Sequence, residues 1–460
     1  MEQRQLDSRT DRLRPQDGSS SARAIVIEPN LRGRERRGAP HAPLGLRPPQ
    51  ARLDEAVGLA RAIDLTILEA GIVPLGVIRP ATFLGTGKVE EIAGLVRSAE
   101  AGLVVMDCAL SPVQQRNLEK AWNAKVLDRT GLILEIFGRR ARTREGTLQV
   151  ELAHLTYQKS RLVRSWTHLE RQRGGFGFLG GPGETQLEAD RRMIEERIAG
   201  IEAELEKVKR TRKLHRLSRR RVPYPIAALV GYTNAGKSTL FNRLTNAKVL
   251  SSDMLFATLD PTLRALELPH GAKIILSDTV GFISDLPTML VAAFRATLEE
   301  VVEADVILHV RDISHADAQA QAQDVMGVLD QLGIDTEDGA KLIEVWNKID
   351  RVDDEERARL SNIVDRAPSG RRPVLVSALT GQGLDRLTAE IEARIAARRV
   401  VLDLDLDSAD GAAISWLYRN AEVLAKDFRQ DGRMRVTVRV DPANAGVVRA
   451  KFNAGEPPLI

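Results

Sequence analysis

The sequence is poor in cysteine, in aromatic residues and in long apolar runs, and each scarcity excludes a class of protein. Cys108 is the only cysteine among 460 residues, so no disulfide can form within the chain and a reducing compartment is expected. Aromatic residues make up 4% of the chain, so aliphatic side chains must build the cores. No apolar run approaches the roughly 18 residues that a membrane span needs, and the N-terminus lacks an apolar signal segment. We therefore expect a cytoplasmic protein without stable membrane insertion.

The overall charge says little about partners, whereas its distribution says more. The net charge is +4, and residues 1–50 alone contribute +4 through ten arginines against six acidic residues. The rest of the chain is therefore neutral overall. Nine Lys or Arg residues gather between Lys207 and Arg221. This basic run is equally compatible with an RNA contact and with a solvated helix face.

The first part of the chain predicts an Arg-rich disordered tail at residues 1–21 and a small α/β domain at residues 22–145. Apolar periodicity alternates there between strand and helix, which indicates a parallel sheet. The expected elements are, in order, a strand at 24–28, a helix at 53–70, a strand at 72–78, a helix at 89–99, a strand at 103–107, a helix at 111–122 and a strand at 126–128.

The pattern then changes to that of a helical hairpin at residues 146–222. A short heptad seam in its second half consists of Ile194, Ile198, Ile201, Leu205 and Val208, and six of the ten residues at 174–183 are glycine. Because the seam covers only about two heptads, it indicates an intramolecular pair in a monomer and not a coiled-coil dimer. A mostly parallel sheet wrapped by helices is expected at 223–400. A small C-terminal α/β domain is expected at 401–460, with a strand at 401–406, a helix at 413–428 and a strand at 434–440.

A phosphate-binding loop of the form GxxxxGKS lies between an apolar strand at 227–230 and a helix at 237–244. Its residues are Gly231, Tyr232, Thr233, Asn234, Ala235, Gly236, Lys237 and Ser238. In this context backbone N–H groups cradle phosphates at a helix N-terminus. We expect Lys237 to reach the β- and γ-phosphates and the Ser238 hydroxyl to bind Mg²⁺.

Two further segments have the order expected of nucleotide-sensing switches. Asp278, Thr279, Val280 and Gly281 follow a strand, which places Asp278 where it could hold a metal-bound water and the Gly281 N–H where it could meet a γ-phosphate. This is the second switch segment. The first switch segment lies upstream and consists of Phe256, Ala257, Thr258, Leu259 and Asp260. Thr258 is the expected second protein ligand of Mg²⁺, with Thr262 as a nearby competitor. Lys237, Thr258 and Gly281 are the predicted catalytic groups. An order–disorder transition of the two switch segments is the expected consequence of losing the γ-phosphate.

A guanine-reading motif follows the apolar strand at 342–346 and consists of Asn347, Lys348, Ile349 and Asp350. The Asp350 carboxylate could accept from both N1–H and the N2 amino group of guanine, a donor pair that adenine lacks. Ser377, Ala378 and Leu379 would cap the base through backbone N–H groups. The three motifs together predict a GTP hydrolase.

Phe282 stands where Ras-like enzymes carry a glutamine that orients the attacking water. A phenyl ring cannot hydrogen-bond to water. The sequence therefore predicts slow hydrolysis in isolation and acceleration by a partner that completes the site.

Five stretches of the chain resemble the HflX GTPases, which are bacterial translation-associated proteins. They are residues 85–91 (GTGKVEE), 110–118 (LSPVQQRNL), 128–137 with 148–152 (DRTGLILEIF, LQVEL), 181–188 (GPGETQLE) and 255–262 (LFATLDPT). The resemblance spans roughly residues 22–400 and includes the apolar residue at Phe282. It implies an N-terminal α/β domain with a helical hairpin, a GTPase domain, and binding to the large ribosomal subunit that stimulates hydrolysis, with roles in splitting or rescuing ribosomes under stress. Leu379 in place of the commoner lysine and the extended Arg-rich residues 1–50 depart from the family pattern.

The hairpin tip is the predicted contact with ribosomal RNA, in agreement with the resemblance. Cations and aromatic rings alternate there, and both bind RNA: Lys159, Arg161, Arg164, Trp166, Arg171, Arg173, Phe176 and Phe178. The alternative is a flexible loop with a solvated basic rim. The GxGxxG pattern at 175–180 follows a helix and not a strand, which argues against a dinucleotide site.

Two other functional hypotheses stay open at this stage. One is a ribosome-assembly factor that binds RNA and uses GTP as a conformational signal. The other is a membrane-associated GTPase, which no lipidation motif supports.

Overall fold

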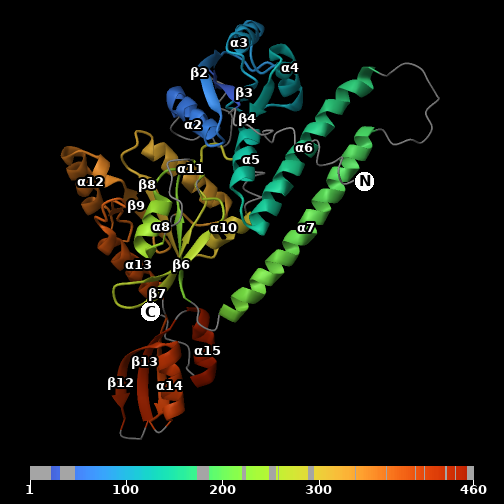
Figure 1. The fold of residues 1–460 in the computed structure, drawn as a ribbon. Helices are drawn as coiled ribbons and strands as arrows, with labels where there is room; N and C mark the ends of the chain where they lie inside the picture. Colours follow the sequence, from blue (N-terminus) through green and yellow to red (C-terminus); the bar gives the residue numbers. More distant parts are fainter. Residues whose placement is uncertain are drawn as a thin grey trace.

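The computed structural model describes residues 22–31, 47–172, 186–219, 224–247, 255–256, 258–287, 295–336, 338–368, 370–398, 400–408, 410–429, 433–440 and 442–452. Three sheets follow one another along the chain, and two long helices extend along one side of the molecule (Figure 1). The fold is α/β, as the sequence predicts. None of the helices in the described ranges is long and apolar enough to span a membrane.

The N-terminal unit is a four-stranded parallel sheet of order β2-β1-β3-β4. Its strands are β1 (Arg23–Leu31), β2 (Thr66–Leu75), β3 (Leu103–Met106) and β4 (Lys125–Asp128), and its helices are α2 (Pro49–Arg61), α3 (Thr86–Ser98), α4 (Pro112–Trp122) and α5 (Arg129–Arg140). Ser111 begins α4 through a capping box with Gln114.

The expected helix at 53–70 is wrong beyond its first half. The helix α2 ends at Arg61, Asp64 adopts a left-handed φ of +58°, and β2 begins at Thr66. The strand pairs with β1 along its whole length. A run of alternating apolar residues suits a helix or a strand, and pairing with β1 decides between them.

Two antiparallel helices form the predicted hairpin, α6 (Arg144–Gln172) and α7 (Gln186–Arg219). Ile201 and Leu205 of the predicted seam are buried against Leu148 of α6. The apolar contact is therefore internal to the pair, as expected.

The nucleotide unit has a six-stranded sheet of order β10-β9-β8-β5-β7-β6, in which only β6 is antiparallel. The strands are β5 (Ile226–Val230), β6 (Thr262–Glu267), β7 (Lys273–Asp278), β8 (Val306–Asp312), β9 (Leu342–Asn347) and β10 (Val374–Leu375). The helices are α8 (Lys237–Thr245), α10 (Arg295–Val302), α11 (Ala318–Gln331), α12 (Asp354–Arg366) and α13 (Leu384–Arg398), with a 3-10 turn η3 (Ile349–Arg351).

The C-terminal unit is an antiparallel sheet of order β11-β13-β12 covered by two helices. Its elements are β11 (Val400–Asp407), α14 (Gly411–Asn420), β12 (Glu422–Phe428), β13 (Arg433–Val440) and α15 (Pro442–Phe452). The expected helix at 413–428 is therefore wrong after Asn420, because the second half of that segment pairs with β13 as an edge strand.

The N-terminal and nucleotide units share one apolar core. Leu53 and Phe137 from the first unit belong to the same buried cluster as Phe256, Phe282 and Val325 from the second. Burial of apolar surface is the main driving force of association, so the two units are held together over a continuous face.

Candidate nucleotide site

The predicted phosphate loop lies between β5 and α8, where the strand–loop–helix order places it. Gly231 has a φ of +148°, and a Cβ atom there would lie 2.2 Å from the carbonyl oxygen of Val310. Gly236 has a φ of +93° and would bring a Cβ within 2.3 Å of the Asn347 amide nitrogen. Both positions therefore require glycine, which explains the motif's spacing.

Lys237 is buried and folds back over its own loop. Its Nζ donates to the carbonyls of Gly231 (3.0 Å) and Tyr232 (2.8 Å). Burial lowers the pKa of this ammonium to about 8, although the nearby Asp278 carboxylate opposes the shift. Gly281 lies beside this ammonium, since a Cβ at Gly281 would be 3.0 Å from the Nζ. The cation and the predicted γ-phosphate sensor are thus neighbours.

Three oxygen groups converge beside the loop. The hydroxyls of Ser238 and Thr258 donate to the Asp278 Oδ2 at 2.7 Å and 3.1 Å and lie 2.9 Å from each other. Thr262, the competitor of Thr258, is instead the first residue of β6, opposite Asp278 in the strand register. Hydrogen bonds thus join three of the four candidate oxygen groups, those of Ser238, Thr258 and Asp278.

These groups fit a small divalent cation. The Asp278 Oδ1 is buried and has no hydrogen-bond partner, and burial raises the pKa of this carboxyl group while its hydrogen bond from Ser238 opposes the shift. Hydroxyl and carboxylate oxygens are the donors that Mg²⁺ prefers, and Mg²⁺ usually keeps several waters beside one or two protein ligands. A cation here would compensate the charge of the buried Asp278 carboxylate, whose Oδ1 has no hydrogen-bond partner.

The predicted guanine reader is joined to both neighbouring loops. The Asn347 Nδ2 donates to the carbonyl of Ala235 (2.9 Å), and its Oδ1 accepts from the Ala378 N–H (3.0 Å). The Ser377 hydroxyl donates to the Asp350 carboxylate and so fixes its orientation. The side chain of Asn347 therefore holds the three base-site segments in register.

Two other members of these segments lie apart from that network. Lys348 has a left-handed φ of +66°, and its ammonium pairs with Asp312 at 2.7 Å. Leu379 is 71% exposed at the surface.

Phe282 is buried in the shared core, pairs with Tyr232 through the backbone, and offers no group to a water. Thr279 anchors its segment through a 2.6 Å hydrogen bond to the Leu229 carbonyl.

The first switch segment packs on the N-terminal unit. Phe256 has a φ of +56° and stacks edge-to-face on Phe137 of α5, with ring centroids 4.7 Å apart. Asp260 accepts from the N–H groups of Arg142 (2.9 Å) and Thr143 (3.0 Å), so its carboxylate is engaged at the start of α6. Leu259 is buried, whereas Ala257 lies outside the described residues.

The RNA-facing candidates are only partly visible. The prediction of Arg161 as an RNA-facing cation is wrong, because its guanidinium pairs with the buried Asp128 at 2.6 Å. Lys159 pairs with Glu195 across the hairpin at 3.1 Å. Arg173, Phe176 and Phe178 lie outside the described residues, as do the side chains of Arg164, Trp166 and Arg171.

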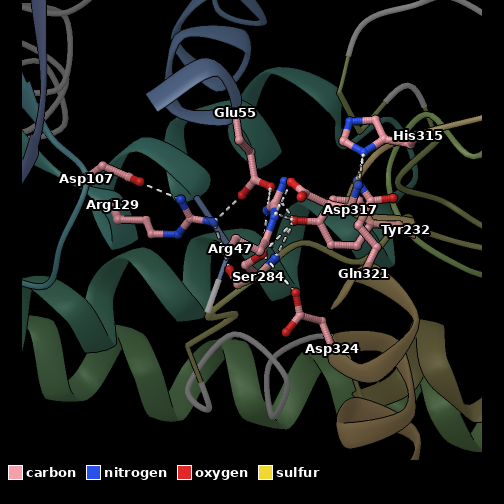
Figure 2. Close-up of polar contacts among 10 residues, drawn as sticks. All are labelled: Arg47, Glu55, Asp107, Arg129, Tyr232, Ser284, His315, Asp317, Gln321 and Asp324. Carbon is pink, nitrogen blue, oxygen red and sulfur yellow. Dashed lines mark hydrogen bonds and ion pairs between the residues drawn. The ribbon is translucent and has the colours of Figure 1, made fainter. Parts of the chain in front are cut away.

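A group of polar residues beside the loop has no motif in the sequence. The Tyr232 hydroxyl meets Glu55 of α2 and Ser284, which follows the second switch, and Arg47 closes the group (Figure 2). Tyr232 occupies a variable position of the phosphate-loop pattern, so its identity carries no signal by itself. Glu55 lies 177 residues away in the sequence.

Four family models match consecutive parts of the chain. They are described as GTP-binding GTPase N-terminal (residues 50–138), GTP-binding GTPase Middle Region (140–219), 50S ribosome-binding GTPase (226–348) and HflX C-terminal domain (362–458).

Curated relatives match most of the chain. It is 50% identical to the GTPase HflX of Magnetococcus marinus over 375 residues, which cover 82% of this chain and 85% of that protein. It is 45% identical to the GTPase HflX of Escherichia coli over 381 residues, which cover 81% and 88%. Among solved structures, a GTP-binding protein from Sulfolobus solfataricus in complex with GDP is 22% identical with a TM-score of 0.43, covering 82% of this chain and 98% of that chain.

Proposed function

This chain belongs to the HflX family of GTPases and is a GTP hydrolase, and from that premise we propose that it is a magnesium-dependent switch on the large ribosomal subunit. One observation carries the switch mechanism, namely the convergence of Ser238, Thr258 and Asp278 on one point. Thr258 belongs to the first switch segment, residues 256–260. Since Thr258 reaches the cation site only when this segment is ordered, the segment responds to the nucleotide and to its cation together.

The proposed roles follow from the geometry. Lys237 would leave the two loop carbonyls to pair with the β- and γ-phosphates. Ser238 and Thr258 would hold Mg²⁺, with Asp278 placed to accept from a water on the ion, and the ion would supply charge neutralisation to the phosphates. The Gly281 N–H donates to the transferring phosphoryl group, so that the chain's contribution is positional and electrostatic.

The base is selected at the opposite end of the site. Asp350, oriented by Ser377, accepts from the guanine N1–H and amino group. Adenine lacks both donors, so the carboxylate would gain no partner from the base, which disfavours ATP strongly. Asn347 holds the reader against the phosphate loop, and the residues 377–379 cover the base.

The partner we propose is the large ribosomal subunit, with ribosomal RNA as the contact. Two observations support it: the nucleotide unit matches a family described as 50S ribosome-binding GTPases, and Phe282 is buried and cannot orient water. A site that lacks this group hydrolyses slowly until a partner supplies it. The cellular roles that fit such a protein are splitting or rescue of ribosomes under stress, in the cytoplasm.

The test is GTP turnover with and without purified large subunits, at two salt concentrations. We expect a large stimulation that weakens with salt, because RNA contacts release counterions. Lys237→Ala serves as the control that binds subunits without turning over. Equal turnover with and without subunits would contradict the ribosomal role and leave GTP hydrolysis itself untouched.

A further inference from the structure

A buried polar network joins the phosphate loop to the segment that follows the second switch. The Ser284 N–H donates to the Tyr232 hydroxyl at 2.8 Å, and the Ser284 hydroxyl lies 2.7 Å from the same oxygen. Tyr232 in turn donates to the Glu55 carboxylate of α2. One phenolic oxygen thus links residues from three separate parts of the chain (Figure 2).

Two arginines of the N-terminal unit complete the enclosure of Ser284. Arg47 donates to the Ser284 hydroxyl (2.7 Å) and to Glu55 (2.5 Å). Arg129 donates to the Ser284 carbonyl (2.7 Å) and to Glu55 (2.5 Å). The Ser284 hydroxyl donates onward to Asp324 of α11 at 2.9 Å. Every polar atom of Ser284 is therefore engaged.

The network is buried, and its two arginines are paired with carboxylates. The side chains of Arg47, Glu55 and Arg129 are 8%, 6% and 9% exposed. Burial opposes ionisation of Glu55, yet the two arginines hold its pKa below the usual value. Burial and the Glu55 carboxylate raise the pKa of Tyr232, so its hydroxyl keeps its proton and remains a donor.

The network acts on the segment that meets the γ-phosphate. Phe282 exchanges backbone hydrogen bonds with the loop, donating to the Gly231 carbonyl (3.1 Å) while its own carbonyl accepts from the Thr233 N–H (2.8 Å). Gly281 precedes this pair and lies against Lys237. Ser284 follows Phe282 by two residues. The position of Gly281 is thus set on one side by the loop and on the other by what holds Ser284.

We propose that Tyr232 and Ser284 are positioning residues for GTP hydrolysis, through which Arg47, Glu55 and Arg129 of the N-terminal unit hold Gly281 in register with the phosphate loop. The N-terminal unit is then part of the hydrolytic machinery and not only an appended domain. This inference rests on the GTP hydrolysis of the chain and is independent of any ribosomal partner.

The test is Tyr232→Phe in the full chain, which removes the hydroxyl and keeps the ring. Tyr157→Phe is the matched control, since the Tyr157 hydroxyl also donates to a buried carboxylate, that of Asp128. We expect the kcat of intrinsic GTP turnover to fall about tenfold in Tyr232→Phe, because small displacements at a reacting centre are costly. The KM for GTP, the Kd for GDP and the melting temperature should stay within about twofold and a few degrees of the wild type.

A double-mutant cycle with Glu55→Gln separates positioning from general loosening. If both residues act through one network, the second substitution adds little to the fall in kcat that the first causes. Ser284→Ala and Ser284→Thr give a second readout. The first removes the hydroxyl and the second keeps it, so Ser284→Thr is expected to retain more activity. An unchanged kcat in Tyr232→Phe, a loss shared by Tyr157→Phe, or additive effects with Glu55→Gln would overturn the proposal. Turnover without ribosomes is the readout throughout, so a failed ribosomal stimulation would not be mistaken for its failure.

Discussion

The Asn347 side chain donates a 2.9 Å hydrogen bond to the carbonyl of Ala235, which ties the guanine reader to the phosphate loop. Its carbonyl oxygen accepts from Ala378 at the same time, so one amide serves two loops. All of these groups are buried or nearly so, and an unsatisfied buried polar group costs roughly 1–3 kcal/mol. The two ends of the site therefore depend on each other.

We expect Asn347→Ala to weaken binding of both GDP and GTP by more than tenfold and to lower the melting temperature, because two backbone groups lose their partner. Isothermal titration and thermal unfolding would measure the two effects. Asn347→Asp keeps the acceptor for Ala378 and removes the donor to Ala235. Its nucleotide affinity should therefore lie between those of the wild type and Asn347→Ala. Equal affinities in all three proteins would show that the bridge does not hold the base site.

The convergence of Ser238, Thr258 and Asp278 predicts a specific magnesium phenotype. In Ser238→Ala one hydroxyl is lost, and we expect the Mg²⁺ concentration for half-maximal GTP turnover to rise about tenfold or more. Ser277→Ala is the control, since it also removes a serine hydroxyl next to Asp278, and that hydroxyl has no hydrogen bond to the cluster. A Mg²⁺ dependence identical in the two variants would remove Ser238 from the proposed site.

The pKa of Lys237 predicts that nucleotide affinity depends on pH. In the nucleotide-free protein burial lowers this pKa to about 8, and a bound polyphosphate would raise it. The complex therefore holds more protons than the free protein above pH 8. Affinity should be full below about pH 8 and fall as the pH rises beyond it, by up to about tenfold per pH unit.

Titration calorimetry in buffers of different ionisation enthalpy would measure the expected proton uptake on GDP binding at pH 8.5. The residual binding of Lys237→Met should show no such uptake. Glu28 also has a pKa of about 8, so uptake that vanishes in Glu28→Gln instead would assign the proton to Glu28.

Glu28 predicts a separate effect, on stability. Its side chain is fully buried in β1, and burial and the neighbouring Asp107 raise its pKa to about 8, although Arg52 opposes the shift from 3.0 Å. The folded chain then binds more protons than the unfolded chain between pH 4.5 and 8. The contribution of the neutral carboxyl group to stability is thus present below pH 4.5 and lost as the pH rises through 8.

Glu28→Gln should flatten this dependence. We expect the melting temperature of the variant, relative to the wild type, to be higher at pH 9 than at pH 6. Parallel curves over this range would mean that Glu28 is ionised in the fold at both values.

Local patterns predict some parts of the molecule and not others. The phosphate loop is encoded in eight consecutive residues, and its glycines are explained by contacts as close as that of Gly231 with Val310. Residues 62–70 and 421–428 were predicted as helix and are mostly strand or turn, because short apolar runs suit both and distant pairing decides. The roles assigned to the switch and base residues remain predictions.

The support around Ser284 could not be predicted from the sequence. Glu55, Tyr232 and Ser284 belong to no shared motif, and the fold alone brings Glu55 to Tyr232 across 177 residues. Tyr232 occupies a position where the phosphate-loop pattern accepts any residue. Arg161 was mistaken for a surface cation for a similar reason, since only the fold shows that Asp128 lies beside it.

Because the two hairpin helices are long, a small angular change at their base becomes a larger displacement at their far ends. With 29 residues in α6 and 34 in α7, they measure about 43 Å and 51 Å at 1.5 Å per residue. Figure 1 shows the two helices side by side. Just before α6 begins, the N–H of Thr143 donates to Asp260, a residue of the first switch segment. A tilt of about 5° at that base sweeps the far end of α6 through about 4 Å, so an angular change too small to notice at the hinge becomes a step of more than one bond length at the other end.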